Sequence, residues 1–365
     1  MTPTGGAAVS CRNVTVGYGP GSLVIPELDL EVDRGEMVAL LGPSGSGKTT
    51  ILSVIAGFLR ARSGEIEVGG RLVAGPDRHE PPERRDLAVV FQGYALWPHM
   101  NALDTVAFPI RRRGVVAAEA RREAAHILDV LAIGHLADRR PAELSGGEQQ
   151  RVGLGRALAR NASLYLFDEP TAHLDAALRE RLQSEIVLHR RQSGAGALYA
   201  THDTSEALAL ADRVVLIRGG RIVQQGEPAA VYSSPVDLWA ARLTGPASII
   251  DVRLDGRGPG RVPVDVAGCA QSVEVGSADP VVAGPIRAVV RPDWVRLGGD
   301  LPATVEMVAF RGPHTDYRLA TPAGSVGLRV PGRPVIALGE AISWTLERLW
   351  VVGDDASRPM DVGSL

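Results

Sequence analysis

A glycine-rich segment with one lysine carries the strongest chemical signal in the sequence. It reads Gly42, Pro43, Ser44, Gly45, Ser46, Gly47, Lys48, Thr49 and Thr50. Glycines at this spacing let backbone N–H groups turn around phosphate oxygens, and a helix that begins here adds partial positive charge. Lys48 is the only lysine in the chain, so the site needs a compact ammonium rather than a guanidinium. The segment predicts an ATP-binding phosphate loop, with Lys48 on the β- and γ-phosphates and Thr49 as a ligand of Mg²⁺.

Two adjacent carboxylates follow a short apolar run. The run covers residues 164–167, and Asp168 and Glu169 come directly after it. A buried strand that ends in this way places both carboxylates at the carboxyl edge of a sheet, where α/β folds bind ligands. We expect Asp168 to bind Mg²⁺ and Glu169 to orient the attacking water as a general base. A solvated acidic strand end is the alternative, and the phosphate loop in the same sheet argues against it.

The elements around these residues alternate between strands and helices. Residues 9–16, 23–32 and 64–73 predict a small antiparallel sheet near the N-terminus. Continuous apolar runs predict buried strands at 37–41, 87–91, 164–167, 197–201 and 214–217. Helical periodicity covers 48–59, much of 101–160, 176–191 and 205–211. This order predicts an α/β fold with a mostly parallel sheet and helices on both faces.

The character of the sequence changes after about residue 244. Gly, Pro and Val become frequent, and short strand-like runs recur at 288–290, 303–310, 317–320 and 326–330. We expect residues 1–243 to form the α/β domain and 244–365 to form a small, barrel-like β domain. The tail after about Gly353 is expected to be poorly ordered.

Composition excludes several classes of function. A formal net charge of -3 provides no basic field, so nucleic-acid binding has no electrostatic support. Cys11 and Cys269 are too far apart in sequence for a metal or redox motif, which fits a reducing cytosol. The N-terminus has no signal-peptide pattern, and no apolar stretch approaches the roughly 20 residues of a membrane span. Any action at a membrane is therefore expected to need a partner.

The segment from Leu144 to Arg151 resembles the signature sequence of ATP-binding-cassette (ABC) ATPases. It reads Leu144, Ser145, Gly146, Gly147, Glu148, Gln149, Gln150 and Arg151. In that family the segment caps the ATP held by the opposite subunit, so the resemblance implies nucleotide contacts from residues 145–148. A serine and two glycines at a helix N-terminus also suit an anion on physical grounds.

Other positions agree with this family in order. Tyr18 resembles the residue that stacks on adenine, and Gln92 resembles the Q-loop glutamine that senses Mg²⁺ and the membrane partner. Asp175 resembles the D-loop aspartate, and His202 resembles the switch histidine that contacts the γ-phosphate. In isolation, such a tyrosine or histidine is more often structural. At position 173 the family commonly has a small residue or asparagine, and this chain has His173. We expect this difference to affect contacts across the dimer.

Two further segments resemble a subgroup of importers for ferric iron, polyamines, sulfate and sugars. Residues 91–100 match one of their motifs, and residues 291–297 with the strands from 305 to 330 resemble their C-terminal TOBE module. The resemblance implies a homodimer that encloses two ATP molecules with Mg²⁺ at the cytoplasmic face of the membrane, bound to permease subunits and indirectly served by a solute-binding protein. It also implies a catalytic set of Lys48, Gln92, Glu169 and His202. We expect Tyr94, Leu96 and Trp97 to be exposed, and such side chains suit a groove for a permease helix.

Three other functions stay open at this point. An ATPase of DNA repair or translation would usually carry a coiled-coil insertion or a second cassette, and neither is visible in the sequence. A regulatory module that acts mainly through its C-terminal domain would not need the full catalytic set. An exporter is disfavoured only by analogy, because its cassettes less often carry such a β domain. The solute also stays open among iron, polyamines, thiamine-like compounds, phosphonates, sulfate and sugars.

Overall fold

The computed structural model of the chain describes residues 6–19, 21–91, 95–172, 174–255, 260–277 and 283–352. Residues 1–228 and 229–365 form two compact units. The division precedes the expected domain boundary at 243, since the buried Arg291 guanidinium of the second unit donates hydrogen bonds to the carbonyls of Tyr232 and Ala241. The expected disorder after Gly353 lies outside the described residues.

The first unit begins with an antiparallel sheet. Its strands are β1 (Ala7–Val16), β2 (Ile25–Asp33), β4 (Ser63–Val68), β5 (Arg71–Gly75) and β6 (Arg78–His79), in the order β2-β1-β4-β5-β6. The prediction of a single strand at 64–73 was wrong. Gly69 and Gly70 both have positive φ, at 59° and 79°, and they reverse the chain between β4 and β5.

A second sheet forms the centre of this unit. Its strands are β3 (Met37–Leu41), β7 (Leu87–Val90), β8 (Leu164–Asp168), β9 (Gly196–Thr201), β10 (Arg213–Arg218) and β11 (Arg221–Gly226), in the order β11-β10-β3-β9-β8-β7. All neighbours pair in parallel except β11, which pairs antiparallel with β10. The α/β prediction is therefore confirmed, although β11 was not predicted.

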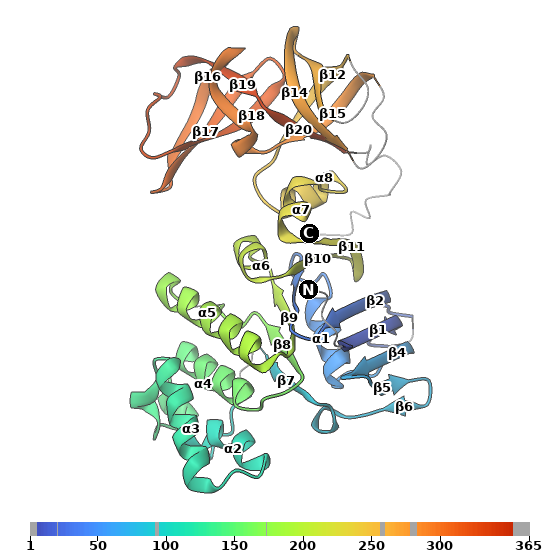
Figure 1. Cartoon of the computed structure of the whole chain (residues 1–365), viewed down its shortest axis with the longest axis vertical. Helices are drawn as coiled ribbons and strands as arrows, with labels where there is room; N and C mark the ends of the chain where they lie inside the picture. The colour runs from blue at the N-terminus through green and yellow to red at the C-terminus, as the bar shows by residue number, and fades with distance from the viewer. Residues whose placement is uncertain are drawn as a thin grey trace. The chain divides into compact units, whose positions relative to one another are not determined.

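Helices cover both faces of the central sheet. They are α1 (Lys48–Ala56), α2 (Ala102–Arg112), α3 (Ala117–Val130), α4 (Gly146–Leu158), α5 (Ala176–Ser193) and α6 (Thr204–Leu210), with 3₁₀ turns at Pro82–Arg84, Gly134–Leu136 and Pro141–Glu143. Within this unit α2, α3 and α4 gather on one side, and the antiparallel sheet lies on the other (Figure 1). Helix α1 ends before the predicted residue 59, because Gly57 turns the chain at φ 91°.

Alternate residues of the central strands pack into two hydrophobic cores, one on each face of the sheet. Leu198 and Ala200 of β9 face the core shared with α1 and the antiparallel sheet. Ala197 and Tyr199 of the same strand face the core formed with the helices α2 to α5. A strand buried on both faces reads as a continuous apolar run, which is why these strands were visible in the sequence.

The second unit is mostly β-structure. It begins with α7 (Pro228–Ser233) and α8 (Leu238–Leu243). A closed barrel contains β12 (Ser248–Leu254), β13 (Gly260–Val266), β14 (Cys269–Ser277), β15 (Gly284–Val290) and β20 (Arg348–Val351). After a 3₁₀ turn at Pro292–Trp294, a four-stranded sheet contains β16 (Val295–Phe310), β17 (His314–Thr321), β18 (Gly324–Pro331) and β19 (Ala341–Leu346). The predicted barrel-like β domain is confirmed. Among the described residues, no helix has the length and apolar character needed to cross a membrane.

Candidate active site

The phosphate loop joins the end of β3 to the start of α1. Gly47 occupies the N-cap position of α1 with φ 106°, a conformation that glycine adopts without steric cost. A Cβ atom on Gly42 would lie 2.4 Å from the carbonyl oxygen of Ile217, so only glycine fits there as well. No side chain of the described residues caps the N-terminus of α1. Its first N–H groups therefore remain available to an anion.

Lys48 lies inside this loop with 6% of its surface exposed. Its Nζ donates hydrogen bonds to the carbonyl oxygens of Gly42 at 2.7 Å and Pro43 at 3.0 Å. Burial lowers the pKa of Lys48, and the nearby carboxylates of Glu169 and Asp168 oppose this effect. The ammonium is thus held on the loop beside two acids.

Other loop positions also offer hydrogen-bond donors. The Ser46 hydroxyl is buried and has no hydrogen-bond partner in the described part of the chain. A buried hydroxyl without a partner is costly, so a ligand oxygen would stabilise it. Together with the uncapped helix and the Lys48 ammonium, these donors fit the phosphates of ATP.

Tyr18 lies next to the phosphate loop. Its hydroxyl is 3.1 Å from the hydroxyl of Thr50, in the first turn of α1. The side chain is nevertheless 65% exposed. An exposed ring anchored beside a phosphate loop is suitably placed to stack on a base.

Asp168 and Thr49 bring oxygen ligands to the same place. Asp168 ends β8, is 5% exposed, and accepts a hydrogen bond from the Thr49 side chain. Burial raises the pKa of Asp168, while Thr49 and Lys48 oppose the shift. No group of three or more His, Cys, Asp or Glu side chains within the described residues could hold a metal ion. One carboxylate and one hydroxyl fit Mg²⁺, which commonly completes its shell with water and substrate phosphates.

Glu169 and His202 meet at the ends of neighbouring strands. The Oε1 atom of Glu169 is 2.8 Å from Nδ1 of His202, which follows β9 directly. Glu169 has φ 49°, an unusual conformation for a side-chain-bearing residue, and its N–H donates to the Ala200 carbonyl at 3.0 Å. Left-handed backbone at a non-glycine residue costs about 1–3 kcal/mol and clusters at functional sites. The strands therefore bring a carboxylate and an imidazole together near the phosphate loop.

The Ser-Gly-Gly segment begins helix α4. Ser145 is the N-cap residue, and its N–H donates to Oε2 of Glu148 at 2.7 Å. This bond lowers the pKa of Glu148. Ser145 and Gly146 are exposed, and Gly147 is half-buried. The helix start is thus accessible to a second molecule, and the predicted nucleotide contacts of residues 145–148 remain a prediction.

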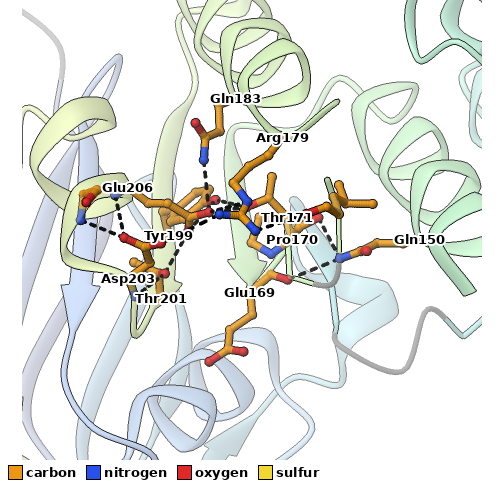
Figure 2. A network of polar contacts seen from close by, with 12 residues as sticks. Gln150, Glu169, Pro170, Thr171, Arg179, Gln183, Tyr199, Thr201, Asp203 and Glu206 are labelled. Carbon is orange, nitrogen blue, oxygen red and sulfur yellow. Dashed lines mark hydrogen bonds and ion pairs between the residues drawn. The ribbon is translucent and has the colours of Figure 1, made fainter. Parts of the chain in front are cut away.

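Gln150 of the same helix holds the backbone beside Glu169. It is 2% exposed, and its Nε2 donates to the carbonyls of Glu169 at 3.3 Å and Pro170 at 2.8 Å. Figure 2 shows the Glu169 carboxylate pointing away from this attachment. No role for Gln150 was predicted from the sequence, although the residue belongs to the signature segment 144–151.

Three positions singled out from the sequence, Gln92, Tyr94 and His173, lie outside the described residues. Asp175 is described: it is exposed and caps α5 by accepting a hydrogen bond from the Leu178 N–H at 3.0 Å. Its place at the start of α5 leaves it on the surface.

A polar network that was not predicted from the sequence lies next to the backbone segments that carry Glu169 and His202. It joins Thr171, Tyr199, Thr201 and Glu206, which lie buried in the described chain (Figure 2). Two signals in the sequence were available: a tyrosine within the apolar run 197–201 and an acidic residue in the short helical segment 205–211.

An apolar hollow is lined in part by Phe91, Ala95 and Trp97. Its volume is about 270 Å³, and Phe58 and Phe108 also contribute to its lining. Trp97 packs edge-to-face on Phe108 at 4.9 Å, and the guanidinium of Arg156 lies 5.1 Å from the centre of the Trp97 ring. Arg156 belongs to α4, so the helix that begins at Ser145 also reaches this hollow.

The sequence of the chain is similar to known proteins along most of its length. A family model described as ABC transporter matches residues 25–172, and a TOBE domain model matches residues 288–352. The chain is 38% identical to the "Fe(3+) ions import ATP-binding protein FbpC" of Brucella abortus, over 89% of this chain and 91% of that protein. It is also 38% identical to the "Spermidine/putrescine import ATP-binding protein PotA" of Thermobifida fusca, over 86% of this chain and 83% of the relative.

A solved structure is also similar. It is titled as a dimeric post-hydrolysis state of the ATP-binding cassette MJ0796 bound to ADP and Pi. The TM-score is 0.56 at 29% identity, and the match covers 60% of this chain and 98% of the other.

Proposed function

Because the chain belongs to the family of ABC transporter ATP-binding proteins, we propose that it hydrolyses ATP to drive import of ferric iron, a polyamine or a similar solute through a separate permease. The observation that carries the proposal is that Lys48, Glu169 and His202 lie together at the carboxyl ends of the parallel strands of the central sheet. The relatives named for import of Fe(3+) ions and of spermidine/putrescine support the direction of transport and the class of solute.

The residues at this edge take separate roles in hydrolysis. Lys48 and the N–H groups of the loop bind the phosphates, which carry most of the negative charge of ATP. Glu169 accepts a proton from the attacking water and orients it. His202, which lies 2.8 Å from Glu169, contacts the γ-phosphate and stabilises its developing charge. Tyr18 stacks on the adenine from its exposed position beside Thr50.

Mg²⁺ belongs with the nucleotide in this proposal. Thr49, Asp168 and Gln92 would hold it, and it would neutralise charge on the phosphate oxygens. Their side chains all provide oxygen ligands, as this ion prefers, and the hydrogen bond between Thr49 and Asp168 supports their joint use.

A second copy of the chain completes each nucleotide site. Residues 145–148 of one copy cap the ATP bound to the phosphate loop of the other, and Asp175 lies at the same interface. The exposure of Ser145 and Gly146 and the dimeric state of the similar ADP-bound cassette support this arrangement. ATP then favours the closed dimer, and hydrolysis weakens the contacts between the copies.

The permease binds at the aromatic hollow around Trp97. Four aromatic side chains line it, which suits an apolar helix of a membrane partner. Helix α4 extends from Ser145 to the Arg156 region, so it can pass motion between the nucleotide and the permease. The chain would therefore act at the cytoplasmic face of the membrane, with the solute-binding protein reached through the permease.

An uptake experiment tests the direction and the solute together. A strain without this chain would be complemented with the wild type or with Lys48→Ala, and uptake of labelled ferric iron and spermidine would be measured. We expect wild type alone to restore uptake of one of the two solutes. Unchanged uptake of both solutes in the deletion strain, with slower efflux of another compound, would instead identify an exporter.

A further inference from the structure

Glu206 accepts hydrogen bonds from three different parts of the fold. It lies in α6 and is 9% exposed. Its Oε1 accepts from the Thr171 hydroxyl at 2.7 Å and from Nε2 of Gln183 at 3.0 Å. Its Oε2 accepts from the hydroxyls of Thr201 at 2.8 Å and Tyr199 at 3.3 Å. One buried side chain thus joins the loop after β8, the end of β9 and helix α5 (Figure 2).

Two of these donors are next to the proposed catalytic groups. Thr171 is the second residue after Glu169, and Thr201 directly precedes His202. The Glu169 and His202 side chains are 2.8 Å apart, and the Glu169 carboxylate lies near the Lys48 ammonium of the phosphate loop. Glu206 therefore binds both backbone segments, the one after Glu169 and the one before His202. The relative position of these segments sets the distance between the Glu169 and His202 side chains.

The chemistry of the network requires an acceptor at position 206. The Thr201 hydroxyl accepts from the Asp203 N–H at 2.9 Å and is left to donate to Glu206. Tyr199 stays protonated because its pKa is raised far above the ordinary value. Burial is the larger cause of this shift, and the negative charge of Glu206 is the second. Its hydroxyl lies 2.9 Å from that of Thr171, which in turn donates to Glu206. A carboxylate with two oxygens satisfies both pairs of donors.

Arg179 extends the network to the D-loop, the segment 171–175 that ends at Asp175. Its Nε lies 3.9 Å from Oε1 of Glu206, and its Nη2 donates to the Leu174 carbonyl at 3.1 Å. Leu174 directly precedes Asp175, which caps α5. Both ends of the segment 171–175 are thereby tied, directly or through one arginine, to the same carboxylate.

We propose that Glu206 is a positioning residue for ATP hydrolysis, which fixes Glu169 against His202 and sets the start of the D-loop relative to both. The proposal rests on the proposed function, since it gives Glu169 and His202 their roles. It adds a buried residue that touches no substrate and that lies on neither the phosphate loop nor the signature segment. Glu206 should consequently affect turnover and leave nucleotide binding nearly unchanged.

Glu206→Gln is the variant that tests this role. An amide has one acceptor oxygen, so one of the two donor pairs loses its partner. Displacements of about 1 Å in an active site can lower rates about 100-fold. We expect kcat of the purified full-length chain to fall about 10-fold or more, with the Kd for ATP within about threefold of wild type.

Glu36→Gln is a matched control. Glu36 accepts hydrogen bonds from Nε and Nη2 of Arg213 and from the Asp33 N–H, at 2.8 to 3.1 Å. It directly precedes β3 and so lies at the edge of the sheet opposite the phosphate loop. This control should lose stability comparably and keep the kcat of wild type. A fall in kcat for Glu206→Gln no larger than for Glu36→Gln would overturn the proposal.

Thr171→Val provides a second measurement that does not depend on the folding of Glu206→Gln. It removes one donor to Glu206, and we expect a smaller decrease in kcat. In the double variant, Thr171→Val should add little to the effect of Glu206→Gln, because both act through one contact. Independent, additive losses would contradict the proposal.

Glu169→Gln measured in parallel distinguishes a wrong assignment of the general base from a wrong role for Glu206. A normal rate for Glu169→Gln would overturn the assignment of the base and hence the proposed function. A large loss for Glu169→Gln together with a wild-type rate for Glu206→Gln would overturn the role of Glu206 alone.

Discussion

Replacement of Lys48 by alanine should remove most of the stabilisation that ATP gives to the first unit. In the free protein the change has opposing effects. It deletes hydrogen bonds from Nζ to the carbonyls of Gly42 and Pro43, which are worth about 1.5–3 kcal/mol each when the donor is charged. It also removes the desolvation cost of a buried ammonium, which amounts to several kcal/mol. We therefore expect the stability of the free protein to change by less than about 2 kcal/mol.

The bound state has no such compensation. The loss of charge-assisted contacts to phosphate at about 2.8 kcal/mol corresponds to about 100-fold weaker binding. At an ATP concentration 100 times the wild-type Kd, ligand binding stabilises the wild type by about 2.7 kcal/mol. The same concentration equals the Kd of the variant, so its stabilisation falls to about 0.4 kcal/mol.

Hydrogen exchange of the α1 amides measures how much ATP stabilises the first unit in the wild type and in Lys48→Ala. ATP would be added with a chelator so that hydrolysis does not deplete it. Arg12→Ala is a suitable control, because Arg12 is exposed and its only described ion pair is with Glu67 on the surface. We expect ATP to slow exchange in wild type and Arg12→Ala but hardly in Lys48→Ala. Equal protection by ATP in Lys48→Ala would refute the assignment of this loop.

Three more predictions concern the base, the docking hollow and the far end of α1. Glu169→Gln should bind ATP, slow hydrolysis at least about 100-fold and accumulate an ATP-bound dimer, as seen by gel filtration; rapid turnover would contradict the role of Glu169. Trp97→Ala should reduce co-purification with the permease, whereas Phe310→Ala, which removes an exposed aromatic ring from the second unit, should not. Arg85→Met should lower the free energy of unfolding of the first unit by about 3 kcal/mol, because the loss of the donor to the carbonyls of Val54, Ile55 and Glu80 outweighs the relief of Arg85 desolvation; a change below about 1 kcal/mol in urea unfolding would contradict this.

The parts of the site that follow one another in sequence could be predicted. The phosphate loop follows the apolar run of β3 and precedes the apolar face of α1, so its position was fixed by neighbouring residues. Asp168 likewise ends β8, Glu169 directly follows that strand, and His202 directly follows β9. Only the adjacency of parallel strands was then needed to bring their ends together.

The supporting contacts could not be read in the same way. Glu206 reaches Thr171 across 35 positions of the chain and Gln183 across 23. These bonds depend on how α5 and α6 pack against the strand ends, and sequence periodicity gives no information on that packing. The turn between β4 and β5 was missed for a more local reason, because two adjacent glycines lay within an otherwise strand-like segment.

A complementation experiment on nucleotide retention can show whether two copies of the chain share each ATP. One chain would carry Lys48→Ala and the other Ser145→Arg, both combined with Glu169→Gln to prevent hydrolysis. Ser145 is exposed, so the larger side chain can be accommodated in the single chain. If the site is shared, each mixed dimer has one intact site, formed by Lys48 of one copy and Ser145 of the other. We expect that neither variant alone retains ATP through gel filtration and that their mixture does. A mixture that retains no more ATP than the separate variants would show that two copies do not share the site.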